Sequence, residues 1–289
     1  MALDIIIVNY NSGRYLSACL ESLDKTTFEQ QKKIFVFDNG SSDSSVAQAR
    51  EHLAGPAVGY IMCKANIGFA AAVNKVIART HGDLILLVNQ DMIVLPGAVD
   101  GLVRFMEQHP RCGIAGGEIL KPDGSRQLTC RRFPGYFNVL FGRRSVFNRC
   151  LPANPFSRRY LYSDLDYARP QKVDFLEGSL LLIRRKALDD CGALDDRFFM
   201  YLEDADLSYR LREHGWETWW VDRAYAIHFR GENTRKENIH PMIHHSRSFY
   251  TFFNKHYRPG VLLRLAMKLA LCVRLGYVIS TESAKAYLR

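Results

Sequence analysis

Residues 83–91 read Asp-Leu-Ile-Leu-Leu-Val-Asn-Gln-Asp, and this stretch decides the fold. Five consecutive apolar residues between polar ones predict a short strand buried on both faces, as in the middle of a parallel sheet. The strand ends in two amides and a carboxylate, at the edge where open α/β sheets collect ligands. Oxygen ligands of this kind suit a hard divalent cation and, through it, phosphate oxygens.

Short apolar runs recur along the chain, and several are followed by segments with helical periodicity. This alternation predicts right-handed βαβ units and an α/β fold: a single, mainly parallel, Rossmann-like sheet flanked by helices. The strands are expected at residues 4–8, 33–37, 58–62, 84–88, 112–115, 173–175, 179–183, 218–221 and 225–229.

The bulk composition narrows the class of protein. The chain has 289 residues and a net charge of +9, which suits an anionic partner (a nucleotide diphosphate, a membrane surface or a nucleic acid) or is simply a basic surface. The seven cysteines form no C-x-x-C pair, so neither a disulfide framework nor a zinc site is expected, and a cytoplasmic setting fits best. The apolar run at residues 5–8 is too short for a signal peptide or a membrane span.

Polar clusters follow four successive predicted strands. They are Asn9-Tyr10-Asn11, Asp38-Asn39, the Asn66–Gly68 turn that opens a helix containing Asn74, and Asn89-Gln90-Asp91. Each cluster alone is ordinary turn chemistry. Because the carboxyl ends of parallel strands meet at one edge, four in succession predict a nucleotide-binding crevice.

A second polar group lies downstream. Glu203, Asp204 and Asp206 begin a predicted helix over residues 204–214, behind an aromatic run. They either complement the helix dipole or, because crowded carboxylates raise one another's pKa, include a general base. His228 follows a strand and precedes a polar turn, so it is either structural or faces Asp91 across the crevice.

Residues 121–172 differ in composition and are named here the basic insertion. They hold eleven Lys/Arg against three Asp, interleaved with aromatic residues, and are expected to be largely irregular or weakly helical. The insertion either docks a lipid-linked diphosphate acceptor or the bilayer surface, or is a solvated lid or an oligomer contact. Basic residues among aromatics are also typical of nucleic-acid binding, but no recognition motif is present and the acidic cluster would repel phosphate.

The C-terminal tail, residues 259–289, contains an amphipathic stretch at 261–279. Its charges are Arg264, Lys268 and Arg274, which the helical period places within one side. Three charges argue against a bilayer span. The helix is expected either to lie flat on an anionic membrane or to pack its apolar face on the domain.

The order of these motifs resembles the family-two inverting glycosyltransferases of the GT-A fold, in particular the bacterial rhamnosyltransferase-like enzymes of cell-surface polysaccharide synthesis. The resemblance covers roughly residues 4–258. It implies a transferase domain at 1–258, with a nucleotide-sugar-binding half at 1–116 and an acceptor and catalytic half at 117–258.

The resemblance also implies roles for matching residues. Asp38 would hydrogen-bond a pyrimidine base, Asp91 and His228 would hold Mg²⁺ or Mn²⁺, and Asp204 would be the catalytic base. The nucleotide-sugar set is Asn9, Tyr10, Asn11, Asp38, Asn66, Gly68, Asn74, Asn89, Gln90 and Arg230. Groups that orient the base or contact the acceptor or donor sugar are Glu203, Asp206, Glu177, Gly178, Trp219 and Trp220. The family's D-x-D motif is Asn-x-Asp here, so one carboxylate is missing and cation affinity should be lower.

The resemblance predicts an enzyme that moves a sugar, with rhamnose from dTDP-rhamnose as the first choice, to a saccharide or polyprenyl-diphosphate-linked acceptor. Peripheral contact with the inner face of the cell membrane is part of this expectation. A UDP-sugar donor is the alternative within the fold. A non-catalytic nucleotide-sugar-binding or nucleic-acid-binding protein is the alternative from another class.

Overall fold

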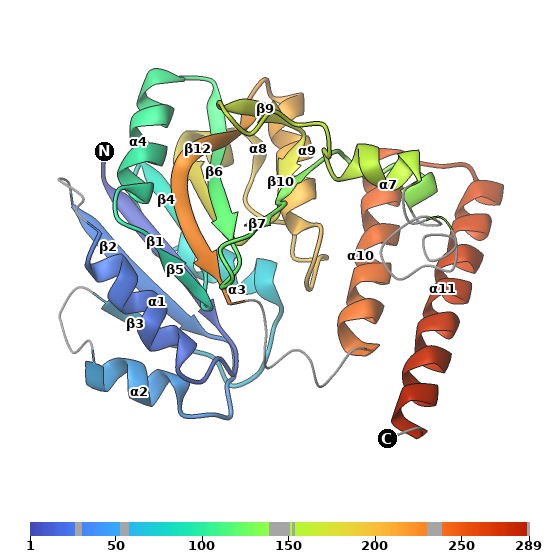
Figure 1. Ribbon diagram of the computed structural model, residues 1–289, viewed down its shortest axis with the longest axis horizontal. Coiled ribbons are helices and arrows are strands. Elements are labelled where there is room, and N and C mark those ends of the chain that lie inside the picture. Colours follow the sequence, from blue (N-terminus) through green and yellow to red (C-terminus); the bar gives the residue numbers. More distant parts are fainter. Residues whose placement is uncertain (27–30, 53–57, 139–150, 152–153, 230–238, 288–289) are drawn as a thin grey trace.

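The computed structural model describes residues 1–26, 31–52, 58–138, 151, 154–229 and 239–287. A mainly parallel mixed sheet has the strand order β3-β2-β1-β4-β11-β6-β12-β5, with β7 beside β6 and β9 beside β12 (Figure 1). Its strands are β1 (Leu3–Asn9), β2 (Lys32–Asp38), β3 (Val58–Met62), β4 (Leu84–Asn89), β5 (Met92–Val94), β6 (Cys112–Leu120), β7 (Arg126–Gln127), β9 (Gln171–Val173), β11 (Leu180–Arg184) and β12 (Glu217–His228). A small antiparallel pair joins β8 (Cys130–Arg131) to β10 (Phe175–Leu176). The predicted sheet is confirmed.

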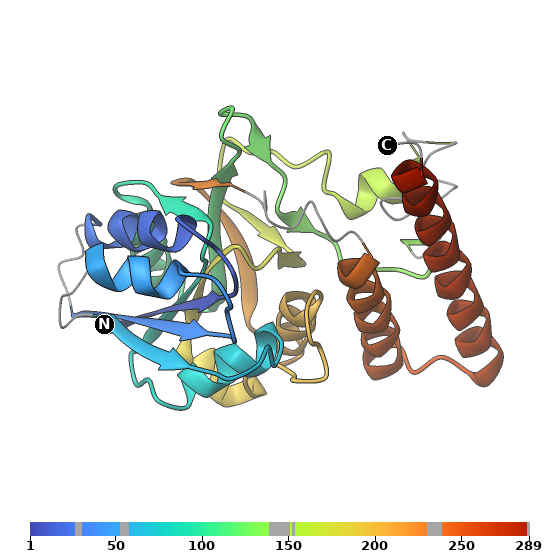
Figure 2. The same cartoon turned by 90° about the horizontal axis from the view of Figure 1, so that it is seen from below.

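Helices cover both faces of the sheet, as Figure 2 shows edge-on. One face is covered by α1 (Tyr15–Asp24), α2 (Ser45–His52) and α4 (Ala98–Gln108). The other is covered by α3 (Phe69–Ile77), α8 (Arg185–Cys191) and α9 (Glu203–Glu213). In β1, Ile5 and Ile7 pack on the first face and Ile6 and Val8 on the second, which is why the central strands are apolar throughout.

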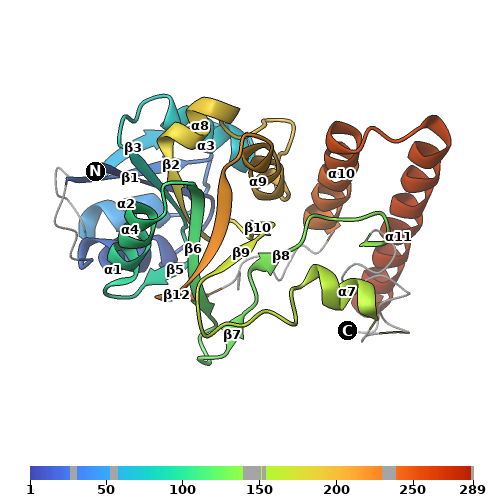
Figure 3. The same ribbon diagram turned by 90° about the horizontal axis from the view of Figure 1, so that it is seen from above.

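Beyond the sheet, α10 (Ile239–His256) and α11 (Val261–Tyr287) form a helical pair, with α11 at the outer edge of the molecule (Figure 3). A separate apolar cluster joins the pair to the segment before α9: Phe198, Leu202, Phe249, Phe252, Phe253, Met267 and Leu271. The predicted domain boundary at 258/259 falls in the turn between these two helices. Within the described residues, no helix is long and apolar enough to cross a membrane.

Some predicted elements need correction. Residues 218–221 and 225–229 are parts of one strand, β12, with an irregularity between Trp220 and Tyr225 where Arg223 has φ 59°. The predicted break is therefore a bulge within a continuous strand. Helices α8 and α10 are absent from the prediction, and α10 carries Pro241 in its first turn, where a missing N–H is tolerated. The basic insertion contains α7 (Pro155–Tyr160), and its residues 139–150 and 152–153 lie outside the described part.

Candidate active site

The ends of β1, β2 and β3 are tied together by amide side chains. The Asn9 Nδ2 donates to Asp38 Oδ1 at 2.9 Å and to Ser45 Oγ at 3.0 Å. Further along the edge, Asn39 Nδ2 donates to Asn66 Oδ1 at 3.0 Å. The predicted convergence of these strand ends is therefore present.

The buried members of this network have little exposed surface that a ligand could contact. Asn9 is 0% and Asp38 2% exposed, whereas Tyr10 is 45% exposed and Asn66 is also at the surface. Asn11 is half-buried and has φ 49°, and its Oδ1 accepts from the Ser42 N–H. Base recognition by Asp38 stays a prediction.

Gly68 fixes where the segment before α9 (Glu203–Glu213) crosses this edge. Its φ is +88°, and an added Cβ would meet the carbonyl oxygen of Phe199 at 2.7 Å. The next amide, that of Phe69, donates to the same carbonyl at 2.7 Å. A residue with a side chain at position 68 would push the segment away. Asn74, one helical turn and a half later, is used differently: its side chain bonds both N–H and C=O of Leu194.

Asp91 and His228 meet as predicted. Met92 of β5 pairs with His228 of β12, which brings His228 Nε2 to 3.2 Å from Asp91 Oδ1. Two ligands of one octahedral cation, each about 2.1 Å from it, also lie about 3 Å apart. The other ring nitrogen, Nδ1, is buried without a hydrogen-bond partner among the described residues. Asn89 and Gln90 are half-buried beside this pair.

The small number of metal ligands at this edge fits a weakly held cation. One carboxylate and one imidazole are adjacent, and no group of three His, Cys, Asp or Glu side chains suited to a metal occurs in the described part of the chain. A hard cation takes about six oxygen or nitrogen ligands, so most would have to come from a diphosphate and water. The residues present therefore fit a cation that binds together with its substrate.

Asp204 lies on the other side of the same edge, in the first turn of α9. Its Oδ2 accepts from the Gly178 N–H at 2.9 Å, and its Oδ1 accepts from the Ala205 N–H. The turn at 177–179 continues to β4, since the Asn89 N–H donates to the Ser179 carbonyl at 3.0 Å. Backbone bonds thus link the Asp204 side to the Asp91 side.

Burial is the main cause that raises the pKa of Asp204, to about 7, and the charge of Glu177 adds to it. The two N–H groups that donate to the carboxylate oppose this rise. Glu177 itself pairs with Arg131 at 2.6 Å, which holds the turn in place. A half-buried carboxyl group that titrates near neutrality is suited to accept a proton.

The backbone before Asp204 is strained. Tyr201 and Leu202 have φ of 71° and 64°, a region that non-glycine residues rarely enter and that costs about 1–3 kcal/mol each. The segment is fixed from both sides, by Phe69 and by the Ser248 Oγ of α10, which donates to the Met200 carbonyl at 2.8 Å. Tertiary contacts therefore hold the backbone in this strained conformation just before α9.

The neighbouring carboxylates differ from Asp204. Asp206 is 0% exposed and accepts from Lys255 Nζ at 2.6 Å, His256 Nε2 at 2.8 Å and Arg210 Nε at 2.9 Å. Glu203 is 7% exposed, and its Oε2 has no hydrogen-bond partner among the described residues. Asp206 is thus fully engaged with α9 and α10, whereas Glu203, beside Asp204, forms no ion pair with a described residue.

The structure does not place the two tryptophans at this edge. Trp220 is 1% exposed and meets Tyr167 edge-on at 5.0 Å, so protein covers its ring. Trp219 packs against Phe105 and His109 of the α4 region, at 5.3 Å from each ring. The expected sugar contact does not fit these positions. Arg230 lies outside the described residues.

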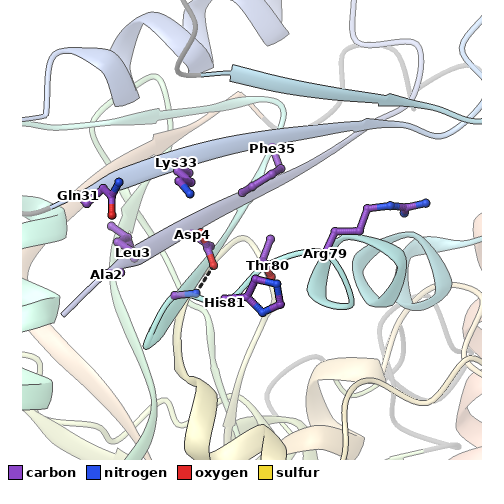
Figure 4. A pocket seen from close by; sticks show the side chains of 10 residues that line it. Ala2, Leu3, Asp4, Gln31, Lys33, Phe35, Arg79, Thr80 and His81 are labelled. Carbon is purple, nitrogen blue, oxygen red and sulfur yellow. Dashed lines mark hydrogen bonds between the residues drawn. The ribbon is translucent and has the colours of Figure 1, made fainter.

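A pocket at the opposite edge of the sheet is separate from this site (Figure 4). It lies at the amino end of β1 and is lined by Asp4, Lys33, Arg79 and His81 among others. The seven residues of β1 place it about 20 Å from Asn9. Asp4 is engaged there by the Gly82 N–H and by Arg185.

Sequence patterns alone missed several residues in the surroundings of Asp204. They are Arg131, Tyr160, Ser248, Lys255 and His256. Tyr160 of α7 is close enough to Asp204 and Glu177 for their charges to raise its pKa further, beyond the larger effect of burial. These contacts join residues about 45 to 50 positions apart, so no local motif could have indicated them.

Three comparisons relate the chain to known proteins. Residues 4–192 match Glycosyl transferase family 2. The N-acetylglucosaminyl-diphospho-decaprenol L-rhamnosyltransferase of Mycobacterium tuberculosis is 31% identical over 261 residues, which are 86% of this chain and 83% of that relative. An N-acetylglucosaminyltransferase of Rhizobium sp. is 33% identical over 78% of this chain and 48% of its own length.

Solved structures share the fold. A mannosyltransferase from Pyrobaculum calidifontis, in complex with GDP-Man and Mn²⁺, has a TM-score of 0.60 at 14% identity and covers 98% of this chain and 75% of its own. S. aureus TarS 1–349 has a TM-score of 0.58 at 15% identity over 97% of this chain and 72% of its own. The GT-A-type architecture expected from the sequence is thereby confirmed.

Proposed function

Since this chain belongs to glycosyl transferase family 2 and is a glycosyltransferase, we propose that it transfers rhamnose from dTDP-rhamnose to a lipid-diphosphate-linked saccharide. The mycobacterial relative, named for rhamnosyl transfer to N-acetylglucosaminyl-diphospho-decaprenol, supports this choice of sugar and acceptor. A UDP-sugar is the alternative donor. Family membership favours an enzyme over the nucleic-acid-binding alternative.

One observation carries the mechanism. Asp204, a carboxyl group with a raised pKa, lies across the sheet edge from the Asp91–His228 pair, and the 177–179 turn joins the two. Such an arrangement separates a proton acceptor from the place where negative charge would develop. It supports direct displacement with inversion.

The proposed step moves one proton and one electron pair. Asp204 accepts the proton of the acceptor hydroxyl while the hydroxyl oxygen bonds to the anomeric carbon of the donor. The bond from that carbon to the diphosphate oxygen breaks, and its electron pair leaves with the nucleoside diphosphate. Attack from the opposite face inverts the anomeric configuration.

Asp91 and His228 would hold the divalent cation, and Asn89 could add a neutral amide oxygen. When bound, Mg²⁺ or Mn²⁺ supplies positive charge that stabilises the departing diphosphate. The Gly178 N–H meanwhile keeps Asp204 oriented toward the edge. Asp206 is proposed to maintain this orientation through its bonds to α10, and Glu203 is proposed to orient the base or the acceptor.

A transfer assay tests the proposal. The purified chain is given dTDP-rhamnose, UDP-N-acetylglucosamine or UDP-galactose with a short-chain prenyl-diphospho-N-acetylglucosamine, with Mn²⁺ or EDTA, and nucleotide release is measured. We expect release with dTDP-rhamnose and Mn²⁺, and NMR of the product should show the inverted anomer. Turnover with a UDP-sugar but not with dTDP-rhamnose would show that the donor assignment is wrong. A product with retained configuration would overturn the mechanism.

A further inference from the structure

The outward side of α11 exposes a row of apolar side chains. Leu262, Leu265, Leu269 and Val273 are 84%, 57%, 67% and 63% exposed. Their spacing of three and four residues aligns them on one helical face about 16 Å long, named here the outer stripe. Single exposed apolar side chains are ordinary, but an aligned row marks an interaction surface.

The packing of α11 sets this orientation. Met267 and Leu271 are buried in the cluster with Phe252 and Phe253 of α10. Arg274 is 7% exposed on the inner side, although the helical period groups it with Arg264 and Lys268. The helix therefore turns its outer stripe to solvent, and the expectation that its apolar face packs on the domain holds only for the inner side.

The charge of the helical pair that carries the stripe indicates the partner. Residues 239–281 contain six Lys/Arg and no Asp or Glu. Arg247, Arg258, Arg264 and Lys268 are exposed, and Arg264 and Lys268 lie on α11 itself. Two copies meeting through their helical pairs would bring like charges together, whereas an anionic surface is complementary to them.

We propose that the outer stripe of α11 docks on an anionic lipid bilayer, with the helix lying in the plane of the headgroups. The apolar row would enter the headgroup and acyl boundary while exposed basic side chains of α10 and α11 meet lipid phosphates. The described part of the chain has no helix able to cross a membrane, which agrees with surface docking.

Docking at α11 would also place the active site relative to the bilayer. Helix α10 lies between α11 and the sheet, and three of its side chains contact the catalytic segment: Ser248 at Met200, and Lys255 and His256 at Asp206. A bilayer under α11 thus holds Asp204 at a fixed height above the headgroups. This consequence rests on the proposed lipid-linked acceptor, while the docking itself does not.

Vesicle cosedimentation of the full chain tests the docking. The vesicles are phosphatidylglycerol with phosphatidylcholine in equal parts, or phosphatidylcholine alone. The test variant is L265E/L269E, and the matched control is Q48E/Q108E, which adds the same charge at exposed positions on α2 and α4. A third variant, L265S/L269S, removes the apolar groups without adding charge.

We expect wild type and control to bind the anionic vesicles within about twofold of each other, and both stripe variants to bind at least about tenfold more weakly. Binding to phosphatidylcholine alone should also be at least about tenfold weaker. Undiminished binding of the stripe variants overturns the proposal. So does a wild-type dimer in sedimentation velocity that L265E/L269E dissociates, with no vesicle binding.

Transfer to a water-soluble acceptor separates the two proposals and controls for folding. Stripe variants that keep this transfer but lose vesicle binding support the docking. A wild-type chain that transfers but does not bind vesicles overturns the docking and leaves the proposed function. A chain that binds vesicles through the stripe but transfers nothing supports the docking and counts against the function.

Discussion

The two sides of the first turn of α9 hold carboxylates in opposite electrostatic states. On one side, hydrogen bonds and ion pairs with His256, Arg210 and Lys255 lower the pKa of Asp206 despite its burial. On the other, burial raises the pKa of Glu203 and Asp204, and their mutual repulsion adds to it for Glu203. Carboxylates within four residues of one another thus divide into a structural anchor and a proposed proton acceptor, according to the partners that tertiary structure supplies.

Removal of the proposed proton acceptor should have the largest effect on activity. Asp204→Asn is expected to lower kcat by about 10³-fold, the usual contribution of a general base, because the acceptor hydroxyl would lose its proton acceptor. Donor affinity should be unchanged, since Asp204 faces the acceptor in the proposed mechanism. Steady-state kinetics and donor titration check both; near-normal turnover would sink the assignment.

Removal of the anchor should act on stability. Asp206→Asn leaves His256, Arg210 and Lys255 facing a neutral amide, and we expect a loss of about 3 kcal/mol in the free energy of unfolding. Urea denaturation measures this. The matched control, Asp166→Asn, breaks the exposed pair with Arg169 and should cost under about 1 kcal/mol. Equal costs in the two variants would contradict the comparison.

The Asp91–His228 pair, which is proposed to hold the cation, should affect donor binding. His228→Ala removes the side chain 3.2 Å from Asp91, and the Mn²⁺-dependent part of donor affinity is expected to fall about 10- to 100-fold. Thermal-shift titrations of donor with Mn²⁺ or EDTA give the measurement. His214→Ala, at the exposed end of α9, is the control. If EDTA weakens donor binding equally in wild type and H228A, the metal role of His228 is wrong.

The pH dependence should follow the pKa of Asp204, which is about 7. A base must be unprotonated, so kcat/KM is expected to fall about tenfold per unit below this pKa and to level off above it. Stability has the opposite trend: the unfolded chain ionises Asp204 near its ordinary value of 3.8, so this group's contribution declines between about pH 4 and 7. D204N should flatten that decline in pH-dependent denaturation.

The smallest effect is expected at Trp219. In W219F an aromatic ring still packs on Phe105 and His109, and the lost hydrogen bond to Glu217 Oε2 should cost about 1 kcal/mol of stability. Turnover and KM should stay within about twofold. A large rise in KM for either substrate would show that this residue contacts sugar after all.

Local sequence patterns were sufficient to specify the sheet and the edge on which the site lies. Buried strands such as β4 appear in the sequence as continuous apolar runs, and the turns that follow them are specified by neighbouring residues. Adjacent strands in a parallel sheet bring their carboxyl ends together, so Asn9, Asp38, Asn66 and Asp91 can be grouped from the amino-acid order alone. The contact between Asp91 and His228 comes instead from the antiparallel pairing of β5 with β12.

Tertiary structure alone decided which polar residue does what. Two of the three side chains that hold Asp206, Lys255 and His256, come from α10, about fifty residues downstream, and nothing near residue 206 encodes them. Trp220 became a core residue because β12 continues through a bulge and buries it, and α11 turned its leucines outward because Met267 and Leu271 fill the space on α10. The burial and charge pairing of a side chain depend on many neighbours that are distant in the sequence. The local pattern therefore determines on which element a side chain lies, whereas packing determines its protonation state and exposure.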